Sequence, residues 1–121
     1  MRKFSFILSF LLATQLAHAT PGQRLAAAAK QQIGVTVRYD GRYQRLAYPG
    51  GDVPMELGVC TDVVIRAYRR LGIDLQQKVH HDMGVAWTAY PSKWGLRSRD
   101  KNIDHRRVLN LATFFRRHGT S

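Results

Sequence analysis

The chain has 121 residues and one cysteine, with 19 Lys and Arg against 8 Asp and Glu, for a formal net charge of +11. This length gives one domain with a modest core, and a single cysteine excludes an intramolecular disulfide framework. The basic excess favours anionic partners, although it is equally compatible with a merely solvated basic surface.

Residues 1–19 have the pattern of a signal peptide. Arg2 and Lys3 precede an apolar run, and Ala-His-Ala at 17–19 supplies the small residues that signal peptidase needs. The apolar run is shorter than the ~20 residues of a membrane span. We therefore expect a mature chain from Thr20 onward that is periplasmic or secreted by a bacterium. An uncleaved N-terminal anchor is the alternative.

The charge of the mature chain indicates its partners. Without the first 19 residues, 17 basic side chains stand against 8 acidic ones. In an exported protein this favours cell-wall peptide or another anionic envelope polymer, and we expect no nucleic acid partner and no membrane span after signal cleavage. The oligomeric state is left open by the sequence.

The first part of the mature chain predicts a helix, a strand and a loop. An alanine-rich helix over 23–33 has Pro21 at its start and Gly34 at its end. Residues 35–39 alternate and are β-prone. The Pro-Gly-Gly-Asp-Val-Pro stretch at 49–54 is a loop, and no Gly-Lys-Ser/Thr follows it, which argues against a phosphate-binding loop.

A second helix is predicted to begin at Cys60 and to end before Gly72. Its arginines, Arg66, Arg69 and Arg70, are expected on the solvent side. Cys60 is expected in the first turn on the inward face. The apolar positions that define this face lie three, four, seven and eleven residues after Cys60, at Val63, Val64, Ala67 and Leu71.

A third helix is predicted over 75–86, with Asp74 as its cap. Its inward residues are Val79, Met83 and Ala86. His80 and His81 point about 100° apart on a helix, so they cannot face one metal ion together. No other ligand cluster accompanies them, and we expect no metal and no cofactor.

The last part of the chain predicts an aromatic patch and a short helix. The patch serves either as a lid on the core or as a ligand platform; it contains Trp87, Tyr90, Pro91 and Trp94. The helix covers 111–117, with Asn110 as its cap. Its apolar side chains, Leu111, Phe114 and Phe115, need a partner surface.

Cys60 is either a small core residue or a nucleophile at the base of a cleft. A free thiol has a pKa of ~8.5, and a helix N-terminus contributes roughly 0.3–1 kcal/mol against ~1.4 kcal/mol per pKa unit. The helix alone therefore lowers a thiol pKa by less than one unit, and Asp62 opposes it. A nucleophilic Cys60 needs a histidine base. His80, His81 and His105 are all open candidates, and His118 is the weakest.

Several motifs stand in one order along the chain, at 33–40, 48–54, 58–66 (Gly-Val-Cys-Thr-Asp-Val-Val-Ile-Arg), 79–80 with 82–83, and 102–107. The chain resembles domain-of-unknown-function family 1287 over nearly all of residues 26–118, and that family is similar to the papain-like cysteine hydrolases that include NlpC-type endopeptidases and amidases. In those hydrolases a cysteine opens a helix and a histidine on a following strand is the base. Only Cys60 matches the nucleophile position.

The resemblance also implies that part of the fold lies outside this sequence. Family members continue past the Phe-Phe-Arg-Arg-His-Gly segment into a strand-rich half that would supply the base, whereas this chain stops at Ser121. Leu109 replaces an expected proline. We therefore expect an α+β chain that is the N-terminal, mostly helical portion of a papain-like fold. Residues 20–121 would be a single, truncated domain.

The expected function is that of an exported cysteine hydrolase that cleaves amide bonds in cell-wall peptide, with activity in doubt because of the truncation. Cys60 is the candidate nucleophile, and His105 and His80 are the candidate bases. Three further residues are candidates for substrate binding: Asp62, Asp104 and Arg106. The alternative is a noncatalytic basic module that binds an anionic envelope polymer through its arginines.

Overall fold

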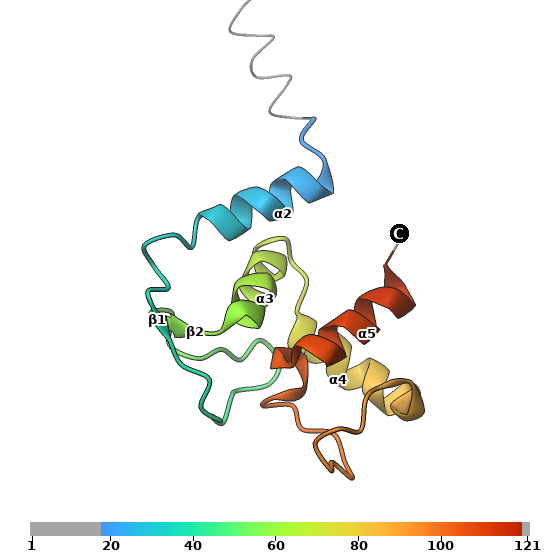
Figure 1. Cartoon of the computed structure of the whole chain (residues 1–121). Helices are drawn as coiled ribbons and strands as arrows, with labels where there is room; N and C mark the ends of the chain where they lie inside the picture. The colour runs from blue at the N-terminus through green and yellow to red at the C-terminus, as the bar shows by residue number, and fades with distance from the viewer. Residues whose placement is uncertain (1–17, 120–121) are drawn as a thin grey trace, which may run out of the picture.

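The computed structural model describes residues 18–119. The signal-peptide prediction therefore falls almost entirely outside the described residues. Within them no helix is both long enough and apolar enough to cross a membrane. The described residues form four α-helices and two 3₁₀ helices (Figure 1): α2 (Pro21–Lys30), α3 (Cys60–Arg70), α4 (Leu75–Val85), η1 (Trp87–Ala89), η2 (Asp104–Arg106) and α5 (Val108–His118).

The described strands form one small sheet. β1 (Arg38–Tyr39) pairs in parallel with β2 (Leu57–Gly58). β1 lies at the end of the extended segment predicted over residues 35–39. A mostly helical chain with a minor strand component is thus confirmed, at this coarse level, as the α+β class.

Two of the helix starts are set by short polar side chains. Thr20 and Gln23 form a reciprocal capping box at α2: the Thr20 hydroxyl accepts from the Gln23 N–H at 3.1 Å, and the Gln23 side chain accepts from the Thr20 N–H at 2.9 Å. Asp74 caps α4 as predicted by accepting from the Gln76 N–H at 3.1 Å. These bonds satisfy N–H groups that have no partner inside a helix.

The predicted cap of the last helix is wrong. α5 begins at Val108, so Asn110 lies inside its first turn. The Asn110 side chain is fully buried and donates instead to the backbone carbonyl of Asp104 at 3.0 Å. The Asn110 amide therefore binds a backbone carbonyl of η2 and does not cap the helix.

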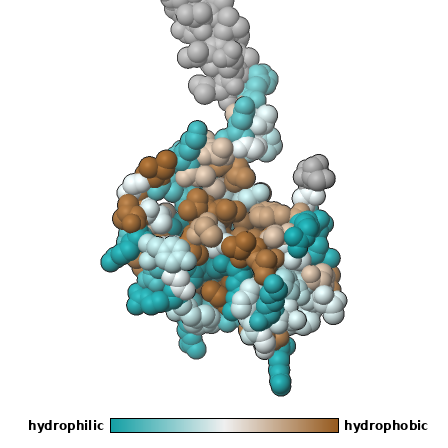
Figure 2. Space-filling model, viewed as in Figure 1, coloured by the Kyte–Doolittle hydropathy of each residue, from teal (hydrophilic) through white to brown (hydrophobic). Residues whose placement is uncertain are grey.

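The apolar core lies where α3, α4 and α5 meet. Its buried aliphatic members come from all three helices, and Tyr90 and Phe114 also belong to it. α2 packs across α3 away from this core (Figure 1). Figure 2, which has the same orientation as Figure 1, shows hydrophobic side chains gathered near the middle of the visible face, with hydrophilic ones around them. The aliphatic core residues are Ile65, Leu75, Val79, Met83 and Leu111.

The buried face of α3 differs from the predicted one. Cys60 and Val64 are exposed, and Arg66, which was expected on the solvent side, is only 4% exposed. The prediction assumed that apolar side chains define the inward face. Instead, hydrogen bonds to partners in other segments hold Thr61, Asp62 and Arg66 inside the protein. The helix is therefore rotated so that these three polar side chains face inward. The buried residues of α3 are Thr61, Asp62, Ile65, Arg66 and Ala67.

Two neighbouring substitutions distinguish the observed face of α3 from the predicted one. Ile65 is 2% exposed and Val64 is 36% exposed. Ile65→Ala should lower the free energy of unfolding by about 2–5 kcal/mol, because it leaves a cavity in the core. Val64→Ala should change it by less than about 1 kcal/mol. Urea denaturation followed by far-UV circular dichroism measures both. Equal losses in the two variants would contradict the observed orientation.

Candidate functional site

Cys60 is the first residue of α3 and its thiol is exposed. The chain reaches it directly from β2 through Gly58 and Val59. Gly58 is buried, and a Cβ there would lie 3.2 Å from the Asp62 Cβ and 3.3 Å from an Arg66 guanidinium nitrogen. The close packing of this backbone against α3 fixes where the helix begins.

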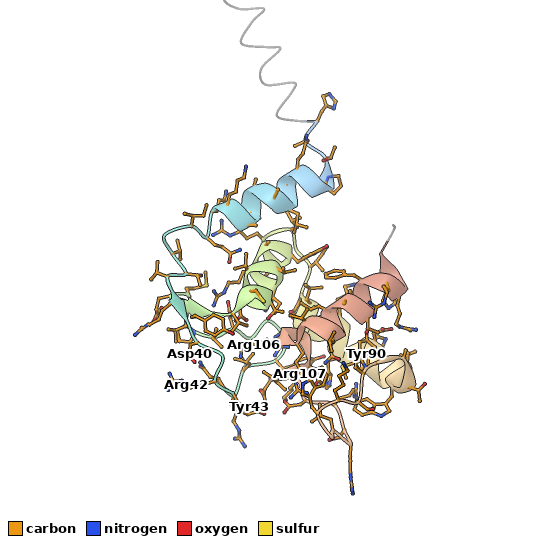
Figure 3. The ribbon with its side chains drawn as sticks, in the orientation of Figure 1. Asp40, Arg42, Tyr43, Tyr90, Arg106 and Arg107 are labelled. Carbon is orange, nitrogen blue, oxygen red and sulfur yellow. The ribbon has the colours of Figure 1, made fainter. Side chains whose placement is uncertain are left out.

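Asp62 holds the start of α3 in two ways. Its Oδ2 accepts from the Val59 N–H at 2.7 Å, which satisfies a donor just before the helix. Its two carboxylate oxygens also accept from Arg106 Nε at 2.9 Å and Nη2 at 3.0 Å. Both side chains of this bidentate pair are 2% exposed. The pair therefore links α3 to η2 inside the protein. Figure 3 labels Arg106, which lies near the start of α3.

A second bond joins the same two elements. The Thr61 hydroxyl donates to the backbone carbonyl of Arg106 at 2.7 Å. Thr61 directly follows Cys60, so the residue next to the thiol is fixed against η2. The first turn of α3 is thus held by one side-chain pair and one side-chain-to-backbone bond.

Arg66 connects α3 to the loop that precedes β2. Its Nε donates to Asp52 Oδ2 at 2.9 Å and its Nη2 to Asp52 Oδ1 at 3.2 Å. The same guanidinium donates to the Leu57 carbonyl at 2.9 Å and to the Thr36 hydroxyl at 2.9 Å. One buried arginine therefore positions the loop and β2 against the helix.

The candidate bases are withdrawn from solvent. His105 is 2% exposed, and burial, followed by the charge of Arg106, lowers its pKa to about 4. His80 is half-buried with its ring edge-on to Tyr48 at 5.2 Å, and burial also lowers its pKa. Among residues 18–119, no hydrogen bond joins either histidine to Cys60.

The three residues expected to bind substrate are brought together around η2. Asp104 is 1% exposed, Asp62 is 2% exposed and Arg106 is 5% exposed. Burial raises the pKa of Asp104, whose carboxylate accepts from the Asp100 N–H at 2.6 Å. All three side chains thus lie inside the protein, beneath the start of α3.

The sequence did not indicate the roles of Arg66 and Asp52. Arg66 lies on a helix that is rich in arginine, and Asp52 lies in a Pro-Gly loop. Neither context distinguishes a buried pair from a solvated one. Within the described part of the chain, no group of three or more His, Cys, Asp or Glu side chains is placed to hold a metal ion.

Comparison with known proteins assigns the chain to a family. The chain belongs to the family described as "Domain of unknown function (DUF1287)", whose model matches residues 26–121. It is similar to the uncharacterized protein YijF of Escherichia coli strain K12, with 58% identity over 94 residues. The match covers 78% of this chain and 46% of YijF, so the chain spans about half the length of that relative. No solved structure matches the chain.

Burial of His105 should make the protein sensitive to acid. The His105 pKa of about 4 in the folded chain lies below the ordinary 6.5. The contribution of neutral His105 to the free energy of unfolding is therefore complete above pH 6.5 and is lost as the pH falls toward 4. The loss over this range should be roughly 3 kcal/mol of unfolding free energy.

The comparison with His105→Gln isolates this contribution. Other groups with shifted pKa values, including Asp104 and His80, are present in both proteins. Urea denaturation at pH 7, 5.5 and 4 should show a steeper loss in the wild-type chain than in the variant. Parallel losses would show that His105 is not held neutral by burial.

Proposed function

We propose that this chain carries the nucleophile of an exported, papain-like cysteine hydrolase that acts on amide bonds in cell-wall peptide. The observation that supports the proposal best is the position of Cys60, which is exposed at the first residue of α3. The first N–H groups of an α-helix have no partner within the helix. The Val59 and Asp62 N–H groups are bonded to Asp62 Oδ2 and to the Val59 carbonyl, so a substrate carbonyl that reaches Cys60 would meet the thiol together with the N–H groups of Cys60 and Thr61.

The proposed reaction follows from that placement. The Cys60 sulfur attacks the carbonyl carbon, and N–H groups at the start of α3 stabilise the oxyanion. The C–N bond breaks, the amine leaves with a proton, and a thioester remains on Cys60. Water then attacks the thioester, which releases a carboxylate and restores the thiol.

The proposal needs an acceptor for the Cys60 proton. His105 is buried and His80 is half-buried, whereas Cys60 is exposed. Efficient proton transfer needs hydrogen-bond reach, directly or through one water. We therefore propose that the acceptor approaches Cys60 from its solvent side and that neither histidine takes this role directly.

The buried residues around η2 have a positioning role in this proposal. Asp62 and Arg106 are bonded to each other, and Asp62 also binds the backbone just before Cys60. Asp104 lies in the same 3₁₀ helix as Arg106. The support for this role is their burial, which places them behind the helix start and away from an incoming peptide.

Removal of the thiol should abolish hydrolysis. Cys60→Ala should lower the release of cleaved peptides from peptidoglycan by about 10³-fold or more, because no other group forms the thioester. Liquid chromatography with mass spectrometry measures the products. Cys60 is the single cysteine, so iodoacetamide treatment of the wild-type chain should cause the same loss. Val64→Ala, an exposed change on the same helix, is the matched control and should retain activity.

Charge favours one alternative function, the binding of an anionic envelope polymer. Of the eight acidic residues, five are paired with arginines, which leaves most basic side chains among residues 18–119 without an acidic partner. Such binding would persist in Cys60→Ala and weaken steeply with added salt. Full product release by Cys60→Ala would refute the hydrolase proposal, and salt-sensitive polymer binding by that variant would favour this alternative.

A further inference from the structure

A groove of about 680 Å³ opens at the other end of α3 from Cys60. It lies between α4 and α5, beside the short connection from α3 to α4. Cys60 and His105 are not among the residues that line it. Its volume is within the range of ~300–1,000 Å³ that is typical of small-molecule sites.

The floor of the groove is aromatic and aliphatic. Tyr68 and Phe115 stack with their ring centres 5.4 Å apart, and Phe114 meets Phe115 edge-on at 5.8 Å. Tyr68, Ile73 and Phe115 are only partly buried, although they pack against the apolar core. The core therefore extends into the groove as a preformed apolar surface that water still reaches.

The rim of the groove is basic. Lys78 and His81 are exposed and lie three residues apart on α4, which places them on the same side of the helix. His118 contributes a third nitrogen-bearing side chain from α5. Because His118 Nε2 is paired with Asp82 Oδ1 at 2.9 Å, an anion at the mouth of the groove would meet Lys78 and the exposed imidazole of His81.

The acidic residue in the lining does not oppose an anion strongly. Asp82 is 5% exposed, and its carboxylate accepts from Arg117 Nε at 2.7 Å and from the Tyr90 hydroxyl at 2.6 Å. The other carboxylate oxygen lies 2.9 Å from His118 Nε2. Its hydrogen bond with Arg117, the largest influence, keeps the Asp82 pKa well below its usual value. The Asp82 charge is therefore balanced by neighbouring donors.

We propose that this groove binds a single amphiphilic anion, a molecule with an apolar body and one carboxylate or phosphate head. The apolar body lies on Tyr68 and Phe115, and the head meets Lys78 and His81. The groove is hollow and of small-molecule size, which favours one molecule over the surface of a bilayer. This site goes beyond the proposed hydrolase and does not depend on Cys60.

Isothermal titration calorimetry of the purified protein with sodium decanoate, below its micelle concentration, tests the proposal. Decanoate should bind at one site per chain. Decyltrimethylammonium has the same tail with a cationic head and should bind at least tenfold more weakly. Equal binding of the two probes, no binding of decanoate, or binding of anionic lipid vesicles alone would overturn the proposal.

A pair of lysine variants locates the site. Lys78→Glu should weaken decanoate binding by about five- to tenfold, because it replaces an attraction at the rim with a repulsion. Lys93→Glu makes the same charge change at an exposed lysine outside the groove and should alter binding by less than twofold. Both positions are exposed, and thermal melts confirm that the variants fold. Equal effects of the two variants would show that the anion binds elsewhere.

Discussion

The described structure depends most on the buried pair of Asp62 and Arg106. Each ion loses several kcal/mol of hydration when it leaves water, and only good geometry and further hydrogen bonds offset that loss. The pair is bidentate and Asp62 also accepts from the Val59 N–H, whereas Arg106 Nη1 is buried without a hydrogen-bond partner among the described residues. The Thr61 hydroxyl adds a bond to the backbone carbonyl of Arg106. The start of α3 is therefore fixed against η2, and Cys60 lies two residues before the buried carboxylate.

A second buried arginine extends the same arrangement on the other side of α3. Arg66 binds Asp52 and the Leu57 carbonyl, so the loop before β2 follows the helix. Hydrogen bonds and ion pairs thus fix the N-terminal end of α3, whereas Tyr68, near its C-terminal end, stacks on Phe115. Tyr68 lies eight positions after Cys60 on the helix, which corresponds to a rise of about 12 Å. The proposed nucleophile and the proposed anion groove are accordingly two separate sites on one rigid helix.

The sequence predicted the starts of α3 and α4 well because those boundaries follow local rules, whereas α2 and α5 begin at Pro21 and Val108, earlier than expected. α4 was expected to begin after Asp74, and Gly72, which was expected to end α3, has a φ of +82° that suits glycine. The orientation of α3 was not predictable from its apolar pattern, because Asp62 and Arg66 find their partners 44 and 14 residues away. The groove was also missed, since its wall combines α3, α4 and α5. Leu111, Phe114 and Phe115 were, however, expected to need a partner surface, and the core supplies much of it.

The most direct test of this account is a double-mutant cycle on the buried pair. The free energies of unfolding of Asp62→Ala, Arg106→Ala and the double variant are compared with that of the wild-type chain by urea denaturation at pH 7. Each single variant should lose about 3–5 kcal/mol, because it leaves a buried charge without its partner. The double variant should lose much less than the sum, with a coupling of about 2 kcal/mol or more. Losses that add to within about 0.5 kcal/mol would show that the pair does not organise the start of α3.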